Sequence, residues 1–373
     1  MKIPLSEPDI SEAEVEEVVS VLRSSRLSLG PKMEEFEASL CSYVDQPFGI
    51  AVSSGTTGLH LCIRALGIGP GDEVIVPSFT FIAAANAVLY EGATPVFVDI
   101  DPLSLNLDPD RVEKAISERT RAILVVHTFG IPAEMDAILE LAERYCLKVI
   151  EDACEAIGAT YHGRQVGSFG DAAVFAFYPN KQITTGEGGM VVTGDRNFAM
   201  QIRAMRNQGR YESDEWHQHS ILGWNYRLSE INCALGCAQM RRIDDILSSR
   251  AAVARAYDEA LSNVDGVERP PLQLAGREIS WFVYVVRLAP RFSREDRDAV
   301  ARMLIARGIG CGRYFAPIHS QPAYSHLPSV SLLTVTESVS SRTLALPFFN
   351  RLDKGRILQV AEALDEAVRS LER

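Results

Sequence analysis

The chain has 373 residues, of which 47% are hydrophobic and 23% charged, so it can bury a sizeable core and is not of disordered composition. Its 49 acidic residues against 37 basic ones give a formal net charge of −12, which argues against a non-specific nucleic-acid surface but still allows a local basic pocket for a phosphate-bearing ligand. The N-terminus lacks the apolar run of a signal peptide, no stretch approaches a membrane span, and the seven cysteines form no C-x-x-C pair. We therefore expect a cytoplasmic protein without a membrane segment or a metal site.

From residue 47 to about 200, short runs rich in Val, Ile and Phe alternate with segments of helical apolar spacing. The runs that predict buried strands are 72–81, 94–100, 120–130, 147–153, 171–179 and 188–194. The helical segments between several of them are 56–68, 81–92, 108–120 and 132–146. This alternation predicts an α/β domain around a mostly parallel sheet, with its sites beyond the carboxyl ends of the strands.

The second half of the chain has a different organisation. A polar loop over 207–220 is followed by apolar residues at helical spacing over 227–261, which predicts one long helix or two in series. Beyond it we expect a smaller α+β unit with a strand over 280–288 and a closing helix over 355–373. The predicted organisation is a large domain, residues 1–245, with a mostly parallel mixed sheet flanked by helices, and a small C-terminal α+β domain, residues 246–373.

The stretch "AVSSGTTGLHLCIRAL" places a Ser-Ser-Gly-Thr-Thr-Gly turn between a strand and a helix. Free N–H groups and the positive end of the helix dipole would face an anion there. Gly55 allows close backbone approach, and Thr56 and Thr57 add hydroxyl donors. An ordinary helix cap explains the same residues equally well. Neither a Walker motif nor a complete G-x-G-x-x-G occurs, which weakens the alternative of a dinucleotide-dependent oxidoreductase.

Two further residues carry chemistry. Asp152 ends the buried run "KVIED", where a carboxylate needs a partner: a structural ion pair is the common case, and a cationic heterocycle nitrogen is also fitting. Lys181 in "FYPNKQITTGEGG" lies between an apolar strand and a glycine-rich turn, where a partly desolvated amine could form a Schiff base. A surface lysine is the alternative for this residue alone. An anion site, a buried carboxylate and a reactive lysine together are what pyridoxal phosphate requires.

The chain resembles the nucleotide-sugar aminotransferases of the fold-type I pyridoxal-phosphate class. The resemblance runs from "IPLSEPDISEAEVEEVV" through "VSSGTTGLHL", "EDACEAIGA", "FYPNKQITTGEGG" and "GWNYRLSEINCALGCAQM" to "PIHSQPAY" and "LPFF". It implies that Lys181 binds the cofactor covalently and that Asp152 pairs with its ring nitrogen. It also implies that Gly55, Thr56 and Thr57 hold the phosphate and that Phe81 stacks on the ring. Asn225 matches a residue that reaches the cofactor of a neighbouring subunit, so a homodimer with shared active sites is expected.

Ala176 and Glu155 depart from the residues that are common in the family, and two further positions have a less specific match. Ala176 stands where many relatives have a phosphate-binding serine. Glu155 stands where many have Gln or His near the cofactor's phenolic oxygen, which a carboxylate would repel unless a proton or a cation intervenes. His319 and Tyr314 match a segment near the sugar-nucleotide site, although an ordinary loop histidine fits nearly as well. His127 is predicted to be a hydrogen-bonded histidine at a strand end rather than a catalyst.

The resemblance implies transfer of the amino group of L-glutamate to a keto sugar of a nucleoside-diphosphate sugar. Within the family the pattern is most similar to enzymes that aminate C4 of a 4-keto-6-deoxyhexose, such as perosamine synthases. Amination at C3, or of a keto-cyclitol, is an alternative. An alternative from another class is a non-catalytic pyridoxal-phosphate-binding or regulatory protein.

Overall fold

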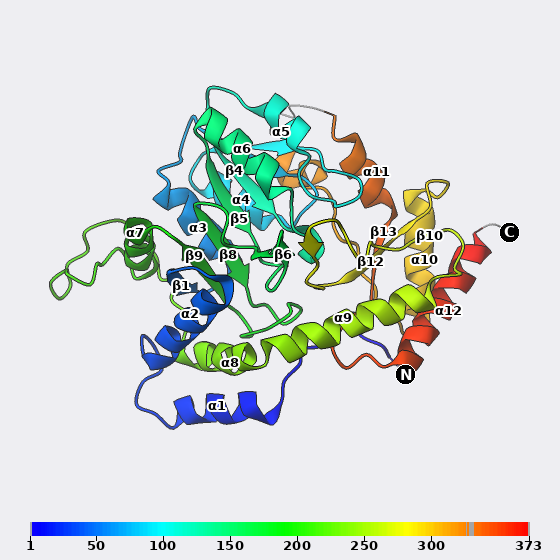
Figure 1. The fold of residues 1–373 in the computed structure, drawn as a ribbon, viewed down its shortest axis with the longest axis horizontal. Coiled ribbons are helices and arrows are strands. Elements are labelled where there is room, and N and C mark those ends of the chain that lie inside the picture. Colours follow the sequence, from blue (N-terminus) through cyan, green and yellow to red (C-terminus); the bar gives the residue numbers. More distant parts are fainter. Residues whose placement is uncertain (1, 326, 328–331, 372–373) are drawn as a thin grey trace.

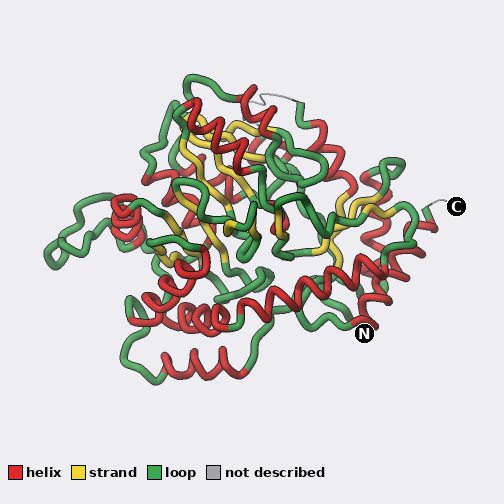
Figure 2. The backbone as a smooth tube through the Cα atoms, viewed as in Figure 1, coloured by secondary structure: helices red, strands yellow, loops and turns green. Residues whose placement is uncertain are grey.

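The computed structural model describes residues 2–325, 327 and 332–371, and Figures 1 and 2 show a large α/β unit joined to a smaller one. A seven-stranded sheet, in the order β1-β9-β8-β5-β4-β2-β3, forms the centre of the large unit. β9 is antiparallel to both of its neighbours, and the other strand pairs are parallel. The strands are β1 (Phe48–Val52), β2 (Glu73–Pro77), β3 (Thr94–Val98), β4 (Thr120–Val126), β5 (Lys148–Asp152), β8 (Ala172–Ala176) and β9 (Gly189–Thr193).

Helices cover both faces of this sheet because its strands are apolar on both sides. Along β4, Leu124 and Val126 join one hydrophobic cluster while Ile123 and Val125 join another, as the two-residue period of a strand requires. The first face packs against α3 (Gly55–Ala65), α4 (Ala83–Tyr90) and α7 (Arg196–Arg206). The second packs against α2 (Pro31–Val44), α5 (Pro109–Ala115), α6 (Met135–Tyr145) and α8 (Glu230–Arg241), and α1 (Glu12–Leu22) lies on α8.

The smaller unit has its own hydrophobic core around an antiparallel sheet, β10-β12-β13. Its strands are β10 (Val267–Glu268), β12 (Tyr284–Leu288) and β13 (Thr343–Leu346), and its helices are α9 (Ile243–Ala260), α10 (Arg294–Ala306), α11 (Thr334–Arg342) and α12 (Lys354–Ser370). A third sheet joins β11 (Arg277–Glu278) to β6 (Thr160–Tyr161) and β7 (Arg164–Gln165) of the large unit. Short 3-10 turns are η1 (Thr128–Gly130), η2 (Ile318–Ser320) and η3 (Pro322–Tyr324).

The α/β class and the mostly parallel mixed sheet are as predicted. The segment 227–261 forms two helices in series, α8 and α9, which meet at Arg242. The strand expected over 280–288 begins only at Tyr284. The proposed boundary between residues 245 and 246 falls inside α9 and stays a prediction, and residues 372–373 of the expected closing helix lie outside the described residues. Among the helices described, none has the length and apolar character needed to cross a membrane.

Candidate active site

A cavity of about 430 Å³ opens where three parallel strands end. Val126, Asp152 and Ala176, the last residues of β4, β5 and β8, all line it. This is the position expected for a site in a parallel sheet, and the volume suits a small-molecule ligand. The residues singled out from the sequence that line this cavity are Gly55, Thr56, Phe81, Asp152, Glu155, Ala176, Lys181 and Tyr314.

The first turn of α3 forms one wall of the cavity. Ser54 caps the helix, since its side chain accepts a hydrogen bond from the N–H of Thr57. The N–H groups of Gly55 and Thr56 belong to the first helical turn and have no acceptor within the helix. Gly55 and Thr56 line the cavity, so this helix end can bind an anion such as a phosphate.

Asp152 presents a carboxylate at the floor of the cavity. Its Oδ1 accepts one hydrogen bond, 3.1 Å long, from the N–H of Cys154. Within the described part of the chain no Lys, Arg or His side chain forms an ion pair with Asp152. The structural ion pair that the sequence left open is therefore not formed there. A largely buried carboxylate in this position is suited to a cationic ligand nitrogen.

Lys181 follows β8 in a loop that side-chain amides hold in place. Gln182 donates to the carbonyl oxygen of Glu155, and Asn232 of α8 donates to that of Thr185. Gln239, also on α8, accepts the N–H of Thr184. These contacts fix the backbone of residues 182–185, directly after Lys181, without regular secondary structure, so the amine of Lys181 has a defined position.

The amine of Lys181 has two close neighbours. Nζ lies 3.5 Å from Oε1 of Glu155 and 4.1 Å from the centre of the Phe282 ring. Glu155 is buried, and its Oε2 accepts the N–H of Phe129 at 2.9 Å. Burial raises the pKa of Glu155, and the lysine charge and the Phe129 N–H only partly oppose this effect.

Two of the aromatic residues that line the cavity, Phe81 and Tyr314, offer different groups to a ligand. Phe81 is 58% exposed, so its ring is available to a ligand. Tyr314 is largely enclosed, with its hydroxyl 3.5 Å from Nδ2 of Asn180, and burial raises the pKa of that hydroxyl. One wall is thus a flat apolar surface and another carries a hydrogen-bonding hydroxyl.

Three predicted site residues do not line the cavity in the described structure. Thr57 uses its hydroxyl within the helix cap, where it accepts the N–H of Ser54 and donates to the Ser54 carbonyl. Asn225 is exposed on the loop before α8. His319 is hydrogen-bonded through Nδ1 to the hydroxyl of Ser78 at 2.7 Å, and its Nε2 lies 3.4 Å from Glu337.

His127 is a buried structural histidine, as its sequence context indicated. Its Nδ1 accepts the N–H of Ala133, so the ring proton lies on Nε2, which faces Glu151 at 3.0 Å. Burial would raise the pKa of Glu151, but the hydrogen bonds from His127, Gly170 and Gly167 outweigh it and lower that pKa. This pair fixes the ends of β4 and β5 beneath the cavity.

Sequence reasoning missed several lining residues, notably Phe282, Asn180 and Cys154. Phe282 comes from the smaller unit, about a hundred residues beyond Lys181, so no local pattern could reveal the contact. Asn180 stands beside Lys181 in the same motif, and proximity to that lysine was the signal that could have found it.

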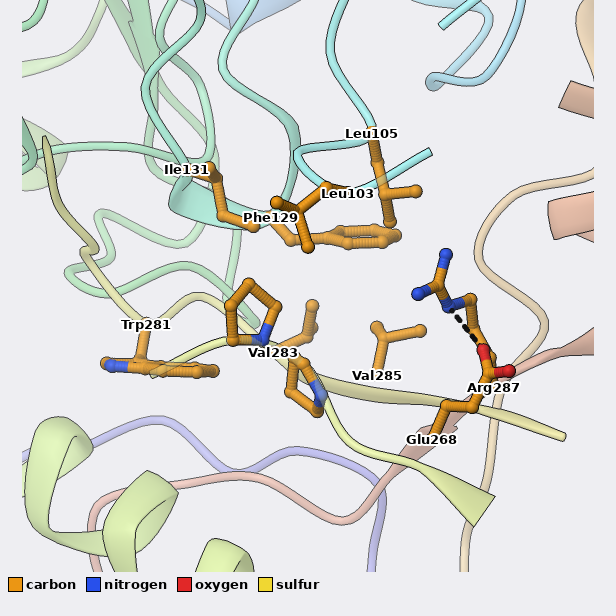
Figure 3. A pocket seen from close by; sticks show the side chains of 11 residues that line it. Leu103, Leu105, Phe129, Ile131, Glu268, Trp281, Val283, Val285 and Arg287 are labelled. Carbon is orange, nitrogen blue, oxygen red and sulfur yellow. Dashed lines mark ion pairs between the residues drawn. The ribbon is translucent and has the colours of Figure 1, made fainter. Parts of the chain in front are cut away.

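A second, much smaller pocket of about 30 Å³ lies between the two units (Figure 3). Leu103, Leu105 and Phe129 face Val283 and Val285 across it, and the ion pair between Arg287 and Glu268 lies at one end. Its walls are mainly apolar, and it holds none of the predicted site residues, so the larger cavity is the candidate active site.

Comparison with known proteins identifies the family of this chain. Residues 8–365 match the DegT/DnrJ/EryC1/StrS aminotransferase family. The chain belongs to this family. It is 44% identical over 342 residues to the GDP-perosamine synthase of Caulobacter vibrioides, which covers 91% of each chain. The structure of S. venezuelae DesV in complex with a ketimine intermediate is 38% identical and has a TM-score of 0.90 over 98% of both chains.

A third relative, the putative sugar aminotransferase Spr1654 from Streptococcus pneumoniae, has been solved in its PLP form. It is 27% identical, with a TM-score of 0.94 over 100% of both chains. The family is dependent on pyridoxal phosphate, so the predicted cofactor and the aminotransferase class are confirmed. The family favours an aminotransferase over the non-catalytic and oxidoreductase alternatives.

The residues present fit this cofactor. Gly55 and Thr56 offer unpaired N–H groups to a phosphate, Asp152 has carboxylate capacity left for a ring nitrogen, and Lys181 places an amine in the same cavity. When bound, pyridoxal phosphate supplies an electron-accepting ring that stabilises the carbanion formed at the substrate. The chain itself supplies the anion site, the carboxylate and the amine that can move a proton.

Proposed function

We propose that this aminotransferase moves the amino group of L-glutamate to a keto sugar carried on a nucleoside diphosphate, at C4 of a 4-keto-6-deoxyhexose. The observation that carries the proposal is the convergence of Lys181, Asp152 and the first turn of α3 on one cavity. The 44% identity to a GDP-perosamine synthase over 91% of both chains supports the sugar substrate.

The residues take the following roles in this proposal. Lys181 holds the cofactor covalently and, once released, carries a proton between the substrate carbon and the cofactor. Asp152 pairs with the ring nitrogen, Gly55 and Thr56 hold the phosphate, and Phe81 stacks on the ring, a contact worth about 0.5–1.5 kcal/mol beyond area burial. Tyr314, which also lines the cavity, binds the sugar through its hydroxyl in this proposal.

We infer further that a second copy of the chain completes the site. Lys181 is the only cation among the described residues that line the cavity, against the carboxylates of Asp152, Glu155 and Glu187. A diphosphate substrate needs more positive charge than this. The loop after α7, residues 207–223, projects from the body (Figure 1) and carries Trp216 at 81% exposure, with Arg210 stacked on it.

Asn225 lies at the base of the same loop, exposed and outside its own cavity, which supports the proposal that it reaches the cavity of a partner. The experiment mixes two variants that the proposal expects to be inactive, Lys181→Ala and Asn225→Ala. In a shared-site dimer, random pairing restores one intact site in half of the dimers, so activity returns to about a quarter of the wild-type value. No recovery after proven subunit exchange would exclude the shared site.

The catalytic assignment has its own test. Borohydride should fix pyridoxal phosphate irreversibly on the wild-type protein and not on Lys181→Ala, and L-glutamate should convert the bound cofactor to its amino form. NMR of the product made from a 4-keto sugar nucleotide then identifies the aminated carbon. Amination at C3, or of a keto-cyclitol only, would replace the proposed substrate, and a cofactor link that survives in Lys181→Ala would overturn the lysine assignment.

The seven cysteines are all free thiols in the structure, which is what a reducing compartment allows. We infer a cytoplasmic location on this ground.

A further inference from the structure

Glu155 and Lys181 form a buried pair that the proposed roles leave unused. Glu155 is 7% exposed, and its Oε1 lies 3.5 Å from Nζ of Lys181. Its other oxygen is occupied by the N–H of Phe129. Among the described residues, Lys181 is the one cation that forms an ion pair with Oε1. The two atoms lie 3.5 Å apart, so a small rotation of the Lys181 side chain must bring them into hydrogen-bond distance before a proton passes between them.

The groups around Glu155 make its charge depend on that lysine. The carboxylate of Asp152, the thiol of Cys154 and the hydroxyl of Tyr314 surround the pair, and none of them is a cation. Burial and the neighbouring Asp152 favour the neutral carboxyl, while the Lys181 ammonium and the Phe129 N–H favour the carboxylate. Once Nζ ceases to be an ammonium, the largest stabilisation of a buried negative charge is gone.

We propose that Glu155 is a catalytic proton acceptor for Lys181, which takes a proton from Nζ when this nitrogen bonds to the cofactor and returns it when the nitrogen is released. The inference rests on the lysine assignment under the proposed function. The ammonium passes one proton to Oε1, which leaves a neutral amine and a carboxylic acid. The amine adds to the aldehyde carbon of pyridoxal phosphate, and its two hydrogens leave with the aldehyde oxygen as water while a carbon–nitrogen double bond forms. In this exchange no proton enters or leaves the protein.

The proton balance of cofactor binding tests the proposal. Calorimetric titration of the apoprotein with pyridoxal phosphate, in buffers of different ionisation enthalpy, gives the number of protons exchanged with solvent. Glu155→Gln keeps a carbonyl oxygen for the Phe129 N–H but cannot take the proton. The variant should release about one proton more per bound cofactor than the wild type. For each unit of pH increase, its affinity for pyridoxal phosphate should therefore rise by about tenfold more than the affinity of the wild type does.

Three comparisons make the result specific. Glu187→Gln changes an exposed carboxylate of the same cavity and should exchange the same number of protons as the wild type. Glu155→Asp retains a carboxylate and should restore the wild-type count. In a Lys181→Ala background, adding Glu155→Gln should no longer change the count, because no amine is left to lose a proton.

Equal proton counts for wild type and Glu155→Gln would overturn the proposal. A one-proton difference that persists without Lys181 would also overturn it, because Glu155 would then respond to the cofactor rather than to the amine. Borohydride reduction separates this failure from that of the proposed function. If the cofactor is fixed on Lys181 while the counts are equal, only the role of Glu155 is wrong; if it is not fixed there, the lysine assignment itself is wrong.

Discussion

Gly55 and Ala176 are in such close contact that a methyl group added at Gly55 would lie 2.8 Å from the Cβ of Ala176. The same added atom would lie 2.8 Å from Sγ of Cys154. The first turn of α3 therefore rests directly on the end of β8, and the absence of a side chain at Gly55 sets how deeply its N–H groups reach into the cavity.

Gly55→Ala should consequently push the end of α3 out of the cavity. We expect the Kd for pyridoxal phosphate to rise at least about tenfold, a loss of about 1.4 kcal/mol. The measurement is a spectral titration of the apoprotein. Gly69→Ala is the matched control, because an added Cβ there comes no closer than 3.7 Å to the carbonyl oxygen of Glu91. Unchanged binding in Gly55→Ala would mean that the phosphate is held elsewhere.

Ala176→Ser should strengthen cofactor binding. Ala176 lines the cavity beside the first turn of α3, so a hydroxyl here would reach the proposed phosphate position. One added hydrogen bond contributes about 1 kcal/mol, which corresponds to a roughly fivefold lower Kd. The same titration measures it. A Kd equal to or above that of the wild type would show that another group already occupies the hydroxyl position.

Asp152→Asn should separate cofactor binding from chemistry. An amide cannot stabilise a positive charge on the ring nitrogen, so the cofactor ring accepts electrons poorly even when bound. We expect the single-turnover reaction with L-glutamate to slow by at least about 100-fold. Stopped-flow absorbance gives this rate, and the titration should show a much smaller change in Kd. Comparable losses of rate and of affinity would mean that Asp152 only supports the structure of the site.

Local sequence was sufficient for the elements that bear the site. The apolar run before Asp152 and the turn before Gly55 each lie within one strand or one strand–helix junction, so spacing and residue type specify them. No local pattern showed that the carboxylate of Asp152 lacks a cationic side-chain partner among the described residues and so remains available to a ligand. That availability depends on which side chains from distant parts of the chain reach the end of β5. Only the structure shows that no described Lys, Arg or His side chain forms an ion pair with Asp152.

The contacts of Lys181 also could not be predicted from local sequence. Its motif marked it as a reactive lysine, but Phe282 approaches it from the smaller unit and Glu155 from the loop after β5. Gln239, which holds the lysine loop through Thr184, has no distinguishing sequence feature within its helix. Such partners depend on how the helices and loops pack together, so a chemistry-bearing residue could be found from the sequence while its environment could not.

Glu14 connects the N-terminal helix α1 to Gln239, the residue that holds the lysine loop. From its contacts we predict that the stability of the fold depends on pH in the acid range. It is 1% exposed, and its carboxylate accepts hydrogen bonds from Ser11, Gln239 at 2.8 Å and Arg242 at 2.7 Å. Burial alone would raise its pKa, but these bonds outweigh burial and lower the pKa from 4.5 to about 2. The folded state thus favours the ionised form. The stabilisation is fully present above pH 4.5 and is lost as the pH falls toward 2, and it amounts to roughly 3 kcal/mol.

Glu14→Gln should remove this contribution. Its free energy of unfolding should be lower than that of the wild type at pH 7 by roughly 2–3 kcal/mol, and the difference should shrink as the pH falls from 4.5 toward 2. Urea unfolding of both proteins at several pH values measures this. Glu12→Gln, on the exposed side of α1, is the control and should leave the profile unchanged. A constant difference at every pH would show that the loss comes from packing rather than from the ionised carboxylate.

Because Gln239 also accepts the Thr184 N–H, the Glu14→Gln variant should in addition loosen the lysine loop, which faster proteolysis near residue 184 would reveal.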